Sequence, residues 1–261
     1  MKLNLPEIGW CGAIDKAAAM HDAGLDYIEL QVVPLKLEDD ASFTEAKARV
    51  RELPLPMPVM SYLFPHDLRL VGPRVDEDRA RAYFDRVVEV MAAGGARLVV
   101  YGSGWTRNVP DGFDARRAED QFLHALGWGA QALAGIGATM VIEPLNRKES
   151  NQCNSVADGV RIARRSGLPN LRSLADFYHV DEEHEHLSEL EVYGQDIVHV
   201  HLADTGRLNP GTGSYDYPAF LGHLKRAGYA GRMSCECAIS GEPVAGMRFS
   251  AAFVRDAWAA A

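Results

Sequence analysis

The stretch ATMVIEPLNRKES, residues 138–150, joins a short apolar run to a loop that carries two carboxylates. The run has the length and composition of a buried strand, and Glu143 falls where this strand should end. A carboxylate at the end of a buried strand is costly unless another group pairs with it. Pro144 can donate no hydrogen bond to a sheet, so we expect it to end the strand and turn the chain outward. The second carboxylate, Glu149, follows Glu143 by six residues.

The same unit recurs along the chain: an apolar run, a polar or glycine-rich loop, and then an amphipathic stretch. Eight runs are strand candidates, at residues 2–10, 27–33, 58–64, 98–101, 139–142, 171–177, 197–202 and 233–238. Helical patterns lie between them, for example at residues 78–95 and 120–137, and each of these two ends in glycines that suit a helix C-terminus.

Eight alternating strands and helices in 261 residues predict a (β/α)₈ TIM barrel. A doubly wound open sheet is the alternative fold. No repeat, linker or low-complexity segment divides the chain, so we expect a single domain over residues 1–261. The barrel prediction also locates the chemistry, because the active site of such a barrel is built at the C-terminal ends of its strands.

Composition narrows the class of protein. The net charge of −9 argues against a nucleic-acid partner, whose binding needs clustered Lys and Arg. The amino terminus lacks the apolar stretch of a signal peptide, and no run approaches the length of a membrane span, so we expect a cytoplasmic protein. The four cysteines form no CxxC pair, which indicates reduced thiols.

Polar groups concentrate at the ends of the last four predicted strands. One residue falls at or near each end: Glu143, Asp176, His201 and Glu236. Three carboxylates and an imidazole cannot share a small buried space without a compensating positive charge, and a divalent cation supplies it. Oxygen-rich ligation with one histidine favours Mn²⁺, Mg²⁺ or Co²⁺ in an octahedral site, with two positions left open for substrate.

Any one of these residues alone is more often a salt-bridge partner or a structural group than a ligand. His199 and His201 lie on one face of a strand, and either could be a structural histidine of the barrel interior. We choose His201 as the ligand because it lies nearer the strand end. His179 follows Asp176 by three residues and is either loop decoration or part of the site.

Other motifs carry less information. The GSG at residues 102–104 lacks the third glycine of a dinucleotide loop. The charge run DEEHEHLSELE, residues 181–191, is typical of a solvated helix face. Cys235 and Cys237 flank Glu236 at strand period, so we expect them to point away from it as packing residues. No cluster of basic residues marks a phosphate pocket, which favours unphosphorylated substrates.

The motifs at the strand ends resemble those of the xylose-isomerase-like TIM-barrel superfamily, and most of all those of the ketose 3-epimerases typified by D-tagatose and D-psicose 3-epimerase. The resemblance extends over nearly the whole chain in element order, but its specific motifs lie in the second half. EPLNRKE at 143–149 matches the fifth-strand motif and DFYH at 176–179 the sixth. His201 with Arg207 resembles the seventh-strand motif, and Glu236 supplies the eighth.

The resemblance implies a role for each matching residue. Glu143, Asp176, His201 and Glu236 would bind one divalent metal, Mn²⁺ first, with Mg²⁺, Co²⁺ or Zn²⁺ as alternatives. Glu143 and Glu236 would also be the general base and acid that carry a proton through an enediolate. Substrate contacts would come from Glu149, His179 and Arg207. The first half matches only in general, so its pocket-wall candidates are less specific: Trp10, Glu29, His66 and Trp105.

The implied function is a metal-dependent epimerase or isomerase that acts on a ketose or a related keto-polyol. Inosose or hydroxypyruvate isomerases and 3-keto-glycoside epimerases or lyases are alternatives on the same site. An apurinic endonuclease would need further histidines on earlier strands, and a non-catalytic sugar binder would not need two glutamates at the proton-transfer positions. The expected partner is a small sugar, with no nucleic acid or membrane, and a homo-oligomer is left open.

Overall fold

Eight parallel strands close into a barrel in the computed structural model, which describes residues 5–261. Each strand pairs with its neighbours in chain order, and β8 pairs back to β1. The barrel prediction is confirmed and the open-sheet alternative is wrong. The strands are β1 (Ile8–Gly12), β2 (Tyr27–Gln31), β3 (Val59–Ser61), β4 (Leu98–Tyr101), β5 (Thr139–Ile142), β6 (Leu171–Asp176), β7 (Ile197–Leu202) and β8 (Arg232–Cys235).

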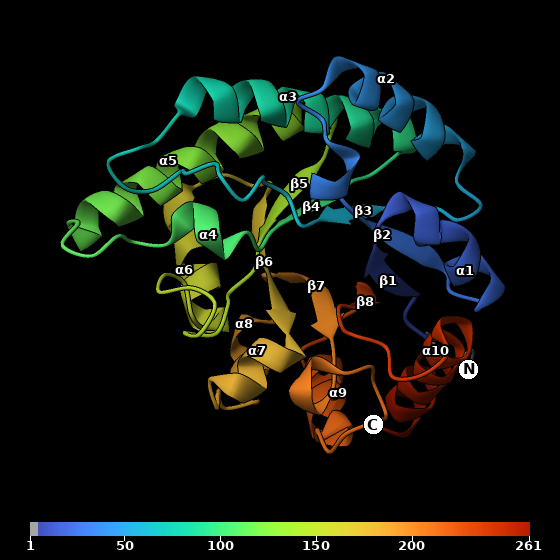
Figure 1. Cartoon of the computed structure of the whole chain (residues 1–261). Coiled ribbons are helices and arrows are strands. Elements are labelled where there is room, and N and C mark those ends of the chain that lie inside the picture. Colours follow the sequence, from blue (N-terminus) through green and yellow to red (C-terminus); the bar gives the residue numbers. More distant parts are fainter. Residues whose placement is uncertain (1–4) are drawn as a thin grey trace.

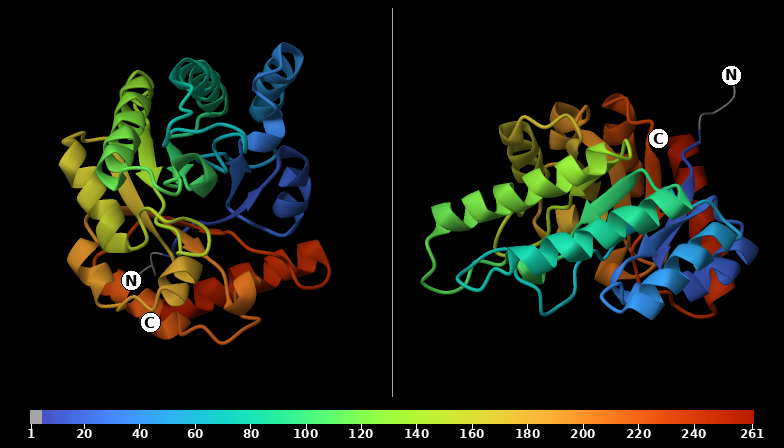
Figure 2. Two further views of the ribbon diagram at one scale, coloured as in Figure 1. Left: turned by 60° about the vertical axis from the view of Figure 1, so that its left-hand side comes forward. Right: turned by 90° about the horizontal axis from the view of Figure 1, so that it is seen from above.

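Helices surround the barrel, and the long α3 and α5 lie side by side on its outside (Figures 1 and 2). The α-helices are α1 (Ala17–Asp22), α2 (Asp40–Arg49), α3 (Glu77–Gly94), α4 (Gly104–Arg107), α5 (Ala115–Ala134), α6 (Val156–Ser166), α7 (Phe177–Glu182), α8 (Glu189–Tyr193), α9 (Tyr217–Arg226) and α10 (Pro243–Ala260). Short 3₁₀ turns are η1 (Ile14–Lys16), η2 (Val33–Leu35), η3 (Val50–Glu52) and η4 (Thr205–Arg207).

Local sequence signals set the ends of the long helices. Asp76 and Asp114 each accept a hydrogen bond from a backbone N–H in the first turn of α3 and α5, which satisfies donors that have no partner inside the helix. Gly95 closes α3 with a φ of 80°, a conformation that only glycine adopts without strain. The predicted glycine stop of this helix is therefore confirmed.

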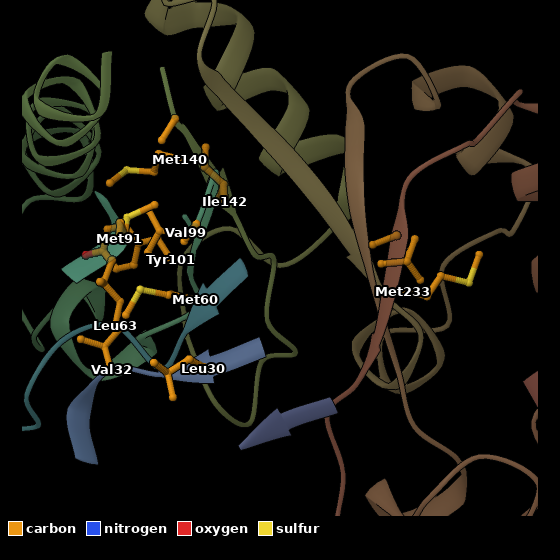
Figure 3. Packing of buried hydrophobic residues seen from close by; sticks show 14 of the residues in the cluster. Leu30, Val32, Met60, Leu63, Met91, Val99, Tyr101, Met140, Ile142 and Met233 are labelled. Carbon is orange, nitrogen blue, oxygen red and sulfur yellow. The ribbon is translucent and has the colours of Figure 1, made fainter. Parts of the chain in front are cut away.

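The core has two parts. The larger lies between the strands and the surrounding helices; Figure 3 shows Met60, Val99 and Met140 gathered on one side of the barrel. Gly129 lets α5 approach the sheet, because a Cβ there would lie 2.5 Å from the methyl carbon of Met140. The smaller part fills the barrel interior, and its buried members are Tyr27, Val59, Val100, Val141 and Leu174.

Strand ends differ from the predictions where a turn competes with the sheet. Strand β3 stops at Ser61 because Tyr62 has a φ of 51°, which is incompatible with an extended strand. Strand β1 begins only at Ile8, and residues 2–4 of the predicted strand lie outside the described part of the chain. The ends at 98–101, 139–142 and 197–202 are confirmed.

The charge run at 181–191 is not one solvated helix face. Helix α7 ends at Glu182, α8 begins at Glu189, and the side chain of Glu183 between them is mostly buried. Within residues 5–261, no helix combines the length and the apolar character needed to cross a bilayer.

Candidate active site

The four predicted metal ligands come together at one end of the barrel. Each is supplied by a different strand: Glu143 follows β5, Asp176 ends β6, His201 lies on β7 and Glu236 follows β8. One ligand atom from each residue lies within 4.8 Å of the corresponding atoms of the other three. The geometry therefore gathers three carboxylates and one imidazole around a common point.

Main-chain hydrogen bonds hold Glu143 in place, and a neighbouring glycine leaves space for its side chain. Its N–H donates to the carbonyl oxygen of Tyr101, and its own carbonyl oxygen accepts a 2.6 Å hydrogen bond from Nη2 of Arg107. A Cβ at Gly102 would lie 1.7 Å from Oε2 of Glu143. The first glycine of the GSG at residues 102–104 thus makes room for this carboxylate.

His201 is oriented by Glu29 on β2, on the far side of the ring from the cluster. Nε2 of His201 donates to Oε1 of Glu29 over 2.9 Å, and His199 approaches the other oxygen of Glu29 at 2.7 Å. Nδ1 of His201 consequently faces the three carboxylates, 3.0 Å from Glu143. A carboxylate that binds the outer nitrogen of a histidine is the usual support of a metal-ligating imidazole.

Within residues 5–261, Asp176 and His179 each leave one buried polar atom without a hydrogen bond, and these two atoms lie 3.8 Å apart. Oδ1 of Asp176 caps α7 by accepting from the N–H of Tyr178, while Oδ2 has no hydrogen bond and lies 3.8 Å from Nδ1 of His201. Nδ1 of His179 accepts from the backbone and side chain of Asn146, while its Nε2 has none. Buried polar groups normally have a partner, so both atoms are free to contact a ligand.

Arg207 links the fourth carboxylate to Glu149. Its Nη2 donates to Oε2 of Glu236 over 2.8 Å, and its Nη1 donates to both oxygens of Glu149. The guanidinium also lies over the ring of Tyr178, 4.9 Å from its centre. The residues that the resemblance implied as substrate contacts therefore surround the cluster.

Electrostatics push the two glutamates in opposite directions. Burial and the nearby Glu236 raise the pKa of Glu143. Burial alone would raise the pKa of Glu236, but His201 and Arg207 lower it to about 2. Burial alone would lower the pKa of His201, yet Glu29 and Glu143 hold it well above its ordinary value. Paired groups whose environments separate their pKa values are suited to acid–base roles.

A cavity of about 410 Å³ opens onto the cluster. Glu143, Glu149, Arg207 and Glu236 all line it, and Tyr62 and Trp105 form part of its wall. His66 is not among the lining residues: its ring stacks on Trp105 with 4.0 Å between the ring centres.

Three other residues singled out in the sequence are placed as follows. Trp10 and Glu29 are buried on β1 and β2 and do not line the cavity. The expectation that Cys237 points away from Glu236 is corrected, because β8 ends at Cys235 and Cys237 lines the cavity beside Glu236.

Several supporting residues could not be recognised in the sequence. Arg107 is fully buried and binds the carbonyl oxygens of Tyr101 and Glu143. Acidic residues of the 181–191 segment hold the loop that carries Glu149: Glu183 pairs with Arg147 and Glu182 with Lys148. Their side chains meet only in the folded barrel, so no local motif marks them.

The donor set fits a divalent cation. The four ligand atoms are close enough to share one ion, the cluster combines hard oxygens with one imidazole, and Oδ2 of Asp176 has no other partner. Glu29 additionally fixes the outer nitrogen of His201. Within residues 5–261, one further group of ligand-type side chains is present, Cys11 with Glu29 and His201, and it shares two residues with this network.

A (β/α)₈ barrel with acidic and histidine side chains at the C-terminal ends of its strands defines an enzyme of the barrel class, with its reaction centre at that end. Residues 17–257 match the family described as xylose isomerase-like TIM barrel, and the chain belongs to this family.

Relatives and solved structures agree with this assignment. The chain is 29% identical over 224 residues to 3-dehydro-D-guloside 4-epimerase of Escherichia coli, covering 81% of this chain and 83% of that protein. It is 30% identical over 132 residues to 2-oxo-tetronate isomerase of Cupriavidus necator, covering 49% and 51%. The structure of D-allulose 3-epimerase from Methylomonas sp. superposes with a TM-score of 0.84 at 18% identity, covering 97% of both chains. These relatives are epimerases and isomerases, and the prediction of an isomerase-class enzyme is confirmed.

Proposed function

We propose that this protein is a divalent-metal-dependent epimerase or isomerase of a keto sugar, with Mn²⁺ as the first candidate metal. The observation that carries the proposal is the convergence of Glu143, Asp176, His201 and Glu236 within 4.8 Å at the base of a cavity large enough for a sugar. These four residues would hold the ion, which would polarise the substrate carbonyl and acidify the neighbouring C–H bond.

The chain itself would supply the proton transfers. Glu143 and Glu236 both line the cavity and come from different strands, so they can act on opposite faces of a bound sugar. One removes the proton from the carbon beside the carbonyl, an enediolate forms, and the other returns a proton. Each positioned acid or base contributes roughly 10²- to 10⁴-fold in rate.

Three further side chains would orient the sugar hydroxyls. Nε2 of His179 has no hydrogen bond within residues 5–261 and lies 3.8 Å from Oδ2 of Asp176, so it would be free to donate to a hydroxyl group of a sugar bound at the cluster. Arg207 and Glu149 pair with each other at the cavity wall and would exchange part of that pairing for contacts with hydroxyl groups. These residues contribute orientation rather than proton transfer.

The relatives support a proposal for the class of substrate. The relatives named above act on a 3-keto-glycoside, an oxo-tetronate and a ketose, and all three can form an enediolate beside the carbonyl. We therefore expect a ketose or a keto-glycoside, with ketol isomerisation as the competing reaction.

The test is proton exchange from D₂O, read by NMR, with the Mn²⁺-loaded protein and a panel of ketoses, inososes, 3-keto-glycosides and hydroxypyruvate. We expect deuterium at one carbon beside the carbonyl, and the product identifies the reaction: an epimer, an aldose or an eliminated aglycone. Absence of exchange into every keto compound would overturn the proposal.

A further inference from the structure

Trp105 lines two cavities at the mouth of the barrel. The first is the candidate active site, and the second has a volume of about 320 Å³. Arg69, Arg74 and Asn108 are among the residues that line the second cavity. The two arginines lie five residues apart on the loop between β3 and α3, where the sequence shows no basic cluster.

The arginines of the second cavity have unused donors. Nη1 of Arg69 donates to the carbonyl oxygens of His66 and Leu68, at 2.6 and 2.9 Å, which fixes the guanidinium. A guanidinium has five N–H groups, and those on Nε and Nη2 of Arg69 have no partner within residues 5–261. The side chain of Arg74 is exposed and forms no hydrogen bond or ion pair with any residue that the structure describes.

No carboxylate of the described chain neutralises this pair. The pKa of Asp67 is lowered mainly by the hydrogen bond that Asp67 makes with Arg79, and the nearby charge of Arg69 lowers it further. Both oxygens of Asp67, however, accept hydrogen bonds from Arg79. In a chain of net charge −9, two arginines that share a cavity without a carboxylate partner are arranged for an external anion.

The two cavities share Trp105 as a lining residue, and Asn108 of the second cavity contacts a residue that lines the first. The indole N–H of Trp105 is directed to the carbonyl oxygens of Phe64 and Pro65, so the ring offers only its apolar surface to the cavities. Asn108 donates to the carbonyl oxygen of Glu149 at 3.4 Å, and Glu149 lines the first cavity. A substrate longer than one sugar ring would have to extend along Trp105 to reach the arginines of the second cavity.

We propose that the second cavity is a subsite for an oxyanion, carboxylate or phosphate, carried by the part of the substrate that does not react. Arg69 would provide the fixed donors and Arg74 the mobile one. The inference rests on the proposed function for where the reacting carbons lie. It adds to the expected keto sugar an anionic group at a distance from the carbonyl, and a phosphate in this place would go against the expectation of an unphosphorylated substrate.

Binding is measured first, with compounds that cannot react. Three phenyl β-D-glucosides differ only in the para group: carboxylate, phosphate or the uncharged carboxamide. Calorimetry with the Mn²⁺-loaded protein should show about tenfold tighter binding of at least one anion than of the amide, as expected for a charge-assisted hydrogen bond. The anion that binds more tightly shows whether the subsite takes a carboxylate or a phosphate.

Arg74→Ala should reduce this preference to the part that Arg69 supplies, without affecting folding, because Arg74 is exposed and pairs with no residue of the described chain. Arg51→Ala is the matched control. Arg51 is exposed and, among the described residues, donates only to the carbonyl oxygen of Lys47. It lies on η3, before β3 rather than after it. The proposal is overturned if the amide binds as tightly as both anions, or if Arg74→Ala leaves the preference intact.

Exchange from D₂O into the 3-keto forms of the same glucosides separates this proposal from the proposed function. Exchange without any preference for an anion would remove the subsite and keep the epimerase. An anion preference that depends on Arg74, without exchange in any compound, would keep the subsite and remove the epimerase.

Discussion

Replacing Glu29 with Gln tests whether the metal site depends on the orientation of His201. Glu29 accepts from Nε2 of His201 at 2.9 Å and lies 2.7 Å from Nε2 of His199, and all three side chains are fully buried. Gln has one acceptor oxygen and one NH₂ group, so only one of the two imidazoles can keep its N–H donor. The other must move its proton to Nδ1.

The size of the effect depends on which histidine changes tautomer. Nδ1 of His199 has no hydrogen bond to any residue that the structure describes, so His199 can change tautomer without breaking another hydrogen bond. In that case His201 stays a ligand and loses only the negative charge behind it, which corresponds to about tenfold weaker metal binding. If His201 changes instead, Nδ1 is protonated and the loss approaches 100-fold, about 2.7 kcal/mol.

The assay is calorimetric titration of Mn²⁺ into metal-free wild type and Glu29→Gln at one pH, with circular dichroism to verify folding. Glu45→Gln on the exposed face of α2 removes the same charge far from the cluster and serves as the control. Equal Mn²⁺ affinity in wild type and Glu29→Gln would refute the role given to Glu29.

Three further predictions use the same structure. Gly102→Ala places a Cβ 1.7 Å from Oε2 of Glu143 and should reduce turnover at least 100-fold while the fold, measured by circular dichroism, is retained; wild-type turnover would contradict the placement of Glu143. Burial raises the pKa of Glu185 to about 7, so the folded state binds more protons than the unfolded state and stability should fall as pH rises from about 4.5 to 7. In denaturant titrations the free energy of unfolding of Glu185→Gln should rise relative to that of wild type by up to about 2 kcal/mol over this pH range, a figure reduced for the partial exposure of Glu185. Parallel pH profiles of the two unfolding free energies would contradict this prediction. Removing metal with EDTA should lower the thermal midpoint, by about 5 to 10 °C relative to protein held at 100-fold the dissociation constant, and an unchanged midpoint would mean that no ion binds the folded state.

The fold was largely predictable because its signals are local. Runs such as 139–142 and 197–202 are mostly apolar, and their ends agree with the strands. The errors fall where side chains or backbone turns intervene. Asp176 caps α7 and so ends β6 one residue early, and Tyr62 turns the chain after β3.

The residues of the candidate site also fall into those that the sequence could predict and those that it could not. Glu143, Asp176, His201 and Glu236 could be found because each stands at the end of its own strand. Their supports could not, since Glu29 and His201 are 172 residues apart and meet only when the barrel closes. Gly102 acts through the absence of a side chain and Arg107 through backbone carbonyls, and neither leaves a recognisable pattern in a single sequence.

Product formation by Glu143→Gln and Glu236→Gln tests the central claim most directly. Both variants are first loaded with metal, and the ion content of each chain is measured. With a keto sugar that the wild type converts, each variant should lose at least 100-fold in the rate of product formation, because each lacks one of the two proton-transfer groups. Product formation at the wild-type rate in either metal-loaded variant would contradict the assignment of this pair.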